Sequence, residues 1–97
     1  MEVGRLVLST QGRDSGRYFI VCQVVDEDFV RIVDGKLHKL VRPKLKKVKH
    51  LQAKPFLASE LFAAGMPEQD ARVRKALAAW EQGQAMSPTK EEMNVQE

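Results

Sequence analysis

YFIVCQVVDEDFVRIVDG, residues 18–35, decides the fold of this chain of 97 residues. It holds two runs of β-branched and aromatic residues, 18–25 and 29–33, separated by three acidic residues. Such runs favour strands, and the first is too short and too rich in Val, Ile and Phe to favour a helix. Asp34 and Gly35 then predict a hairpin with a type I′ turn, which needs a positive φ at both central positions.

Further strand and turn signals lie on both sides of this stretch. Residues 3–9 are β-rich, and the loop after them contains Gly12 and Gly16, which are typical turn residues. After the hairpin turn we expect a return strand at 36–42, a loop at 43–49 and a last short strand at 50–53. Strands that recur roughly every 10–12 residues with tight turns predict a small all-β barrel or sandwich.

An amphipathic pattern beyond the predicted strands indicates a helix at residues 68–82. Val73, Leu77 and Trp80 recur at spacings of four and three, which places them on one helical face. Asp70 falls in the first turn, where the helix dipole favours negative charge. Two roles for the apolar face stay open. In the first, the face packs on the barrel. In the second, the chain is a protein-interaction adaptor that docks a partner through the barrel or through this face, with Trp80 as a binding hot spot.

These patterns predict a mainly β chain with a C-terminal helical appendage. We expect a barrel over residues 1–54, one or two helices over 55–83, the shorter at 57–64, and a flexible polar tail over 84–97. Charge follows the same division. Residues 1–54 carry 12 Lys/Arg and 6 Asp/Glu, whereas 55–97 carry 4 and 7. The positive field of the first part favours an anionic partner.

The most basic stretch is KLHKLVRPKLKKVKHLQ, residues 36–52, which contains no acidic residue. Its apolar residues recur at helical spacing, but Pro43 would cost a helix about 3 kcal/mol. It also lacks the uninterrupted apolar stripe and aromatic residues of a membrane-surface helix. Although a run of lysines is often only a solvated surface, this concentration on a β scaffold is suited to phosphates. The apolar side chains expected to pack on the core are those of Leu37, Leu45, Val48 and Leu51, and the lysines between them are expected to face outward.

The residues that could act in catalysis or metal binding do not indicate an enzyme. Cys22 lies in the middle of a predicted strand, where a buried inert thiol is expected. Together with His38 and His50 it does not match the spacing of a zinc site, and no P-loop or dinucleotide-binding motif is present. We therefore expect no catalytic residue, metal or cofactor. The single cysteine fits a reducing cytoplasm. No apolar run reaches membrane-spanning length, and we expect no secretion signal.

The ordered series STQGRDSGRYFIVCQVVDEDFVRIVDG, residues 9–35, resembles the KOW motif. In that motif a short loop ending in glycine, here Gly16, leads into an apolar strand, a polar turn and a second strand. The initial VGR, the VDG after the second strand and the basic segment that follows are similar to KOW-domain large-subunit ribosomal proteins. The resemblance covers about residues 2–53.

This resemblance implies an SH3-like, five-stranded barrel that binds RNA, usually ribosomal RNA, without catalysis. The residues it assigns to RNA binding are Arg13 and Arg17 in the glycine loop, and Lys39, Arg42, Lys44, Lys46, Lys47 and Lys49 after the hairpin. It assigns loop-shaping roles to Gly12, Gly16 and Gly35, which also fit ordinary tight turns. The chain lacks the long basic C-terminal extension of those ribosomal proteins, so a peripheral or transient contact with the ribosome is expected.

Overall fold

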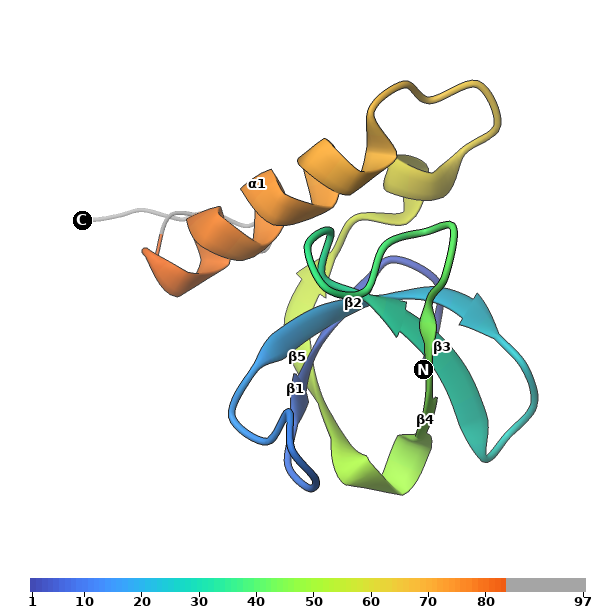
Figure 1. The fold of residues 1–97 in the computed structure, drawn as a ribbon, viewed down its shortest axis with the longest axis vertical. Helices are drawn as coiled ribbons and strands as arrows, with labels where there is room; N and C mark the ends of the chain where they lie inside the picture. The colour runs from blue at the N-terminus through green and yellow to red at the C-terminus, as the bar shows by residue number, and fades with distance from the viewer. Residues whose placement is uncertain (84–97) are drawn as a thin grey trace.

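In the computed structural model, which describes residues 1–83, five antiparallel strands form one sheet in the order β4–β3–β2–β1–β5 (Figure 1). The strands are β1 (Arg5–Ser9), β2 (Tyr18–Val24), β3 (Phe29–Val33), β4 (Lys44–Lys47) and β5 (Leu51–Leu57). The sheet curls on itself, and the one-turn 3-10 helix η1 (Val48–His50) connects its two edge strands. The expected mainly β, five-stranded fold is confirmed. The predicted tail at 84–97 lies outside the described residues.

Apolar residues cover both faces of the central strands. Inside the curled sheet, Phe19 and Val21 of β2 pack with residues of β1 and β3. On the other face, Ile20 of the same strand packs with Leu6 and with residues of the C-terminal helix. A strand covered on both sides needs a continuous apolar sequence rather than an alternating one. This explains why residues 18–21 read as an unbroken run.

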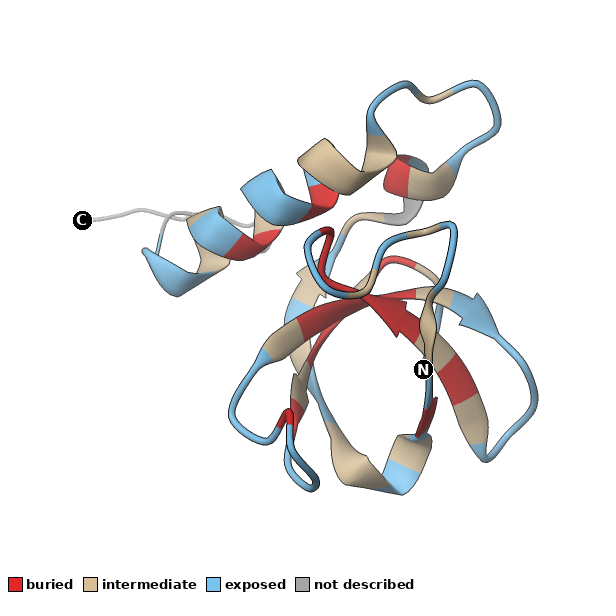
Figure 2. Cartoon of the chain, viewed as in Figure 1, coloured by how far each residue is buried: buried red, intermediate tan, exposed pale blue. Residues whose placement is uncertain are grey.

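The helix α1 (Gln69–Glu81) crosses the outer face of the sheet and is close to the predicted span. The buried positions of this helix lie on its side toward the strands (Figure 2). Val73 and Leu77 are buried there, and the Trp80 ring lies 6.3 Å from that of Tyr18 and 6.4 Å from that of Phe56. The apolar face of α1 therefore packs on the barrel. The shorter predicted helix is reduced to the 3-10 helix η2 (Ser59–Phe62).

The predicted return strand at 36–42 is wrong, because these residues form a loop that follows β3. The Oδ1 atom of Asp34 accepts the backbone N–H groups of Lys36 and His38, both at 2.9 Å. The carbonyl of His38 in turn accepts the N–H of Asp34 at 2.9 Å. These local bonds replace the pairing that a hairpin would provide. Of the two central residues of the predicted type I′ turn, only Gly35 has a positive φ, so that turn is wrong as well.

The next strand begins directly after Pro43, at residues expected to form a loop. In β4, Lys44 lies opposite Ile32 and Lys46 opposite Val30. The predicted core contacts of this region are only partly correct. Val48 and Leu51 pack against the buried core, whereas Leu37 is 71% exposed and Leu45 is 47% exposed.

Candidate nucleic-acid interface

Three segments that carry basic side chains meet on one side of the barrel. The β1–β2 loop meets the loop after β3, since Arg17 Nη2 is 3.9 Å from Asp34 Oδ2. The same β1–β2 loop meets β4, since Lys44 Nζ is 3.7 Å from Asp14 Oδ2. We define this cationic face by Arg13, Arg17, Lys36, Lys39, Arg42 and Lys44, all of which are exposed or partly exposed.

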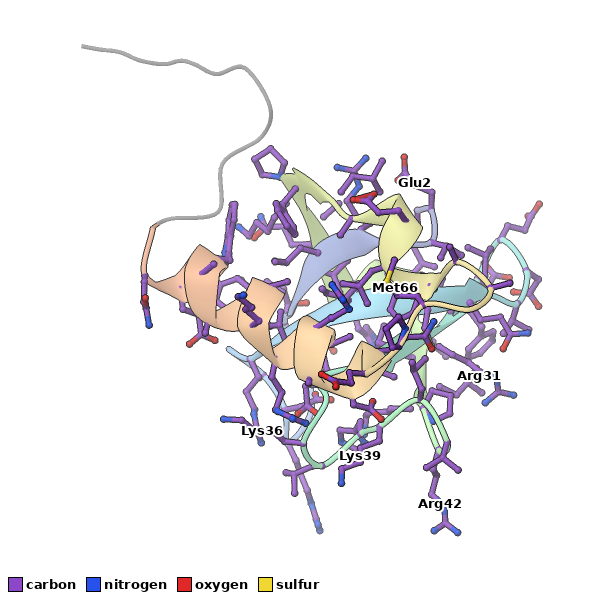
Figure 3. All side chains as sticks on the ribbon, turned by 90° about the horizontal axis from the view of Figure 1, so that it is seen from above. Glu2, Arg31, Lys36, Lys39, Arg42 and Met66 are labelled. Carbon is purple, nitrogen blue, oxygen red and sulfur yellow. The ribbon has the colours of Figure 1, made fainter. Side chains whose placement is uncertain are left out.

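The loop after β3 supplies the most prominent charges of this face. We call residues 35–42 the cationic loop. In Figure 3 the side chains of Lys36, Lys39 and Arg42 extend in the same general direction, away from α1 and the sheet. The same view shows Arg31, on β3, pointing to a different side of the molecule.

A buried carboxylate joins two of the three segments of the cationic face. Asp14 is 6% exposed, and its Oδ1 accepts hydrogen bonds from Ser9 Oγ at 2.8 Å and Lys46 Nζ at 2.9 Å. Lys46 Nζ also donates to the carbonyl of Gln11 at 2.8 Å. Because Ser9 and Gln11 belong to β1 and the loop after it, this cluster connects that loop to the edge strand β4.

Charge and hydrogen bonding keep the Asp14 carboxylate ionised. Burial opposes ionisation, but the hydrogen bonds from Lys46 and Ser9 and the positive charges of Lys46 and Lys44 outweigh it. The pKa of Asp14 is therefore below its usual value. Its Oδ2 has no hydrogen-bond partner among the described residues, although Lys44 lies close to it.

Lys46 differs from the other predicted RNA-binding residues. Residues directly opposite in an antiparallel pair point to the same face, so Lys46 shares the inner face with the buried Val30. Its side chain is only 10% exposed. The expectation that it faces outward is wrong, and the ammonium group stabilises the barrel through Asp14.

Lys47 and Lys49 lie at a separate place. Lys47 is opposite Phe29 and faces away from Lys46. Lys47 and Lys49 line a hollow of about 390 Å³ together with the acidic residues Glu27 and Asp28. The structure thus divides the basic run of the sequence between the cationic face and the surface around η1.

The three glycines assigned to loops all have positive φ angles, as tight turns require: Gly12 (+92°), Gly16 (+87°) and Gly35 (+77°). At Gly12 a side chain would also approach the buried lysine, since an added Cβ would lie 3.3 Å from Lys46 Nζ. A side chain at this position would therefore disturb the Asp14 cluster as well as the turn.

Sequence reasoning missed the residues that hold this face in place. Asp14 lies in a loop that the sequence marks only by its two glycines, and the sequence explains Asp70 only as a charge favoured by the helix dipole. Arg74 had no assigned role, yet its Nη1 donates to the carbonyl of Gly35 at 2.6 Å. Lys36 belongs to the basic run and could have been included on that signal alone. The other three act through contacts distant in sequence, for which a single sequence gives no signal.

Residues 1–83 offer few other groups that could act in catalysis or bind a metal. Burial raises the pKa of the Cys22 thiol to about 11, which keeps it protonated and unreactive at neutral pH. Within residues 1–83, no group of three or more His, Cys, Asp or Glu side chains is placed to hold a metal ion. In the same residues, no helix has the length and apolar character needed to cross a membrane.

Comparisons with known proteins identify relatives, although no family model matches the chain. This chain is 31% identical over 77 residues to the large ribosomal subunit protein eL14 of Hyperthermus butylicus. The aligned residues cover 79% of this chain and 74% of the relative. Over 52 residues it is 33% identical to the proteins of the same name from Desulfurococcus amylolyticus and Aeropyrum pernix. These matches span 54% of this chain and about half of each relative, 54% and 52%. The resemblance to KOW-domain ribosomal proteins is thereby confirmed, and the chain belongs to the family of large ribosomal subunit protein eL14.

Proposed function

We propose that this chain is a non-catalytic RNA-binding protein that contacts ribosomal RNA, or RNA associated with the ribosome, through the cationic face. The observation that carries the proposal is the meeting of three segments that together carry six exposed or partly exposed basic residues (Arg13, Arg17, Lys36, Lys39, Arg42 and Lys44). Lys and Arg side chains placed in this way neutralise phosphates and release counterions. Membership of a ribosomal protein family supports RNA as the polyanion and the cytoplasmic ribosome as its location.

The two kinds of cation serve different contacts. Arg13 and Arg17, in the glycine loop, can each bind a phosphate through two parallel hydrogen bonds or stack on an unpaired base. The lysines act as point charges along the RNA backbone and carry little sequence information. Lys47 and Lys49 form a second, weaker contact region beside η1. This geometry fits a shallow, peripheral contact with RNA.

The salt dependence of binding to structured ribosomal RNA tests the proposal. Replacement of Lys39 and Arg42 by Ala removes two exposed charges without touching the Asp14 cluster. Each lost phosphate contact lowers the slope of log K against log salt by about 0.7–0.9. The double variant should therefore bind more weakly, with a slope lower by about 1.4–1.8.

A control variant of the same net charge is Lys54→Ala with Lys75→Ala, on β5 and α1 and outside the cationic face. We expect this control to keep nearly the full slope. Salt-insensitive binding, or no binding to ribosomal RNA, would refute the proposed function. An equal loss of slope in both double variants would show that net charge alone matters and would refute the assigned face. We do not propose the adaptor role through the Val73, Leu77 and Trp80 side of α1, because the barrel covers it.

A further inference from the structure

Helix α1 touches the cationic loop through two polar side chains one helical turn apart. Asp70 Oδ1 accepts the backbone N–H of Leu40 at 2.9 Å. Arg74 Nη1 donates to the carbonyl of Gly35 at 2.6 Å. The two bonds reach opposite parts of the loop, its first residue and its second half. Residues at positions i and i+4 share a helical face, so one side of α1 presents both groups.

The backbone of the loop also lies directly against the helix. Gly35 is buried, and a Cβ atom added there would overlap the backbone carbonyl of Asp70 and lie 2.8 Å from Arg74 Cγ. Only glycine permits so close an approach. The contact between loop and helix is therefore a packed interface and not only a pair of hydrogen bonds.

The second half of the loop depends most on this support. Its first half is closed by the bonds between Asp34 and His38. In the second half the N–H of Arg42 donates to the carbonyl of Lys39 at 2.9 Å, and Asp70 ties the intervening Leu40 to the helix. The segment stabilised by Asp70 is thus the one that carries Lys39 and Arg42.

We infer that α1 positions the cationic loop for RNA, with Asp70 as the main positioning residue. The inference rests on the proposed function and adds a role for the helix. Because a loop that is already ordered loses less conformational freedom on binding, the Asp70 bond increases affinity for RNA. The hydrogen bond that Asp70 accepts therefore favours binding to a polyanion, whereas the negative charge of Asp70 alone opposes it.

The variants Asp70→Ala and Asp70→Asn separate these two effects, since both remove the same charge. Asn keeps an oxygen that can accept the Leu40 N–H, and Ala does not. We expect Asp70→Asn to bind ribosomal RNA as tightly as the unaltered protein or more tightly. Asp70→Ala should bind about 3–10-fold more weakly than Asp70→Asn, which is the effect of losing one hydrogen bond of typical net strength.

Hydrogen exchange at the Leu40 amide, measured without RNA, supplies an independent readout. The amide should exchange faster in Asp70→Ala than in Asp70→Asn, while Trp80 fluorescence confirms that α1 remains docked in both. Equal Leu40 exchange, or equal RNA affinity of the two variants, would overturn the positioning role and leave the proposed function intact. If the unaltered protein does not bind RNA, the proposed function fails and this inference fails with it.

Discussion

Asp14 shows how one residue can organise a cationic surface without belonging to it. Its carboxylate collects hydrogen bonds from Ser9 and Lys46 and lies near Lys44. A buried ion pair is weak evidence for stability, because desolvation offsets much of the attraction. The loss of one partner is nevertheless costly, since the other charge is then left buried alone. We therefore assign Asp14 and Lys46 to the structural support of the cationic face.

The lowered pKa of Asp14 gives this cluster a defined pH dependence. A carboxylate whose pKa is lower in the folded state stabilises the fold above its unfolded value of about 3.9, and this contribution is lost as pH falls below that value. Asp14→Asn should reduce the free energy of unfolding at pH 7 by about 3–5 kcal/mol. Its deficit relative to the unaltered protein should shrink as the pH falls from 5 to 3. Urea denaturation followed by Trp80 fluorescence measures both.

The matched control for Asp14 is Glu27→Gln, which removes an exposed carboxylate from the β2–β3 turn. An exposed substitution of this kind usually changes stability by less than about 0.5 kcal/mol. A deficit of Asp14→Asn that stays constant across the pH range would contradict the role given to the ionised carboxylate. A deficit no larger than that of the control would contradict the stabilising role of the whole cluster.

The elements differ in how far the sequence predicts them, and the difference is physical. The strands β2 and β3 and the helix α1 were expected within a residue or two, because each has a local apolar pattern that its burial requires. Strand β4 was misplaced because its inward-facing residues are lysines, with Lys46 satisfied by the distant Asp14. The sequence wrongly predicts a strand at the cationic loop, because the structure of this loop comes from Asp34 and α1 rather than from its own residues. The basic segments of the cationic face are therefore visible in the sequence, but the burial of Lys46 and the helix contacts are not.

At the scale of elements, docking of α1 on the sheet can be measured with the chain's single tryptophan. Leu77 is 7% exposed and packs in the cluster with Ile20 and Val73. Leu77→Ala should lower the free energy of unfolding by about 2–5 kcal/mol, as is usual for a leucine removed from a core. The emission of Trp80 should shift to longer wavelength, because its contacts with Tyr18 and Phe56 loosen.

The control for the helix is Lys75→Ala, an exposed position of α1 two residues before Leu77. It changes neither the core nor the loop contacts, so stability and emission should stay close to those of the unaltered protein. Full stability of Leu77→Ala with unchanged emission would contradict the packing of α1 on the barrel. It would also reopen the apolar helix face as a surface for a protein partner.

At the scale of the whole molecule, charge is distributed over two unequal surfaces. On the cationic face, the acidic residues Asp14 and Asp34 are themselves buried, and the basic groups around them reach solvent. Beside η1, in contrast, Lys47 and Lys49 share their hollow with the exposed Glu27 and Asp28. Exposed opposite charges that line the same hollow reduce the potential that a phosphate experiences there.

The smaller net field beside η1 predicts a smaller contribution to RNA binding. Lys47→Ala with Lys49→Ala removes the same charge as Lys39→Ala with Arg42→Ala, so the pair isolates position from net charge. The Lys47 and Lys49 variant should lower the salt slope for ribosomal RNA by less than half of the value of about 1.4–1.8 expected for the other. Both slopes are obtained from titrations between 50 and 200 mM salt, roughly the range over which counterion release is usually measured. An equal or larger fall for Lys47 and Lys49 would move the principal RNA contact to the η1 surface.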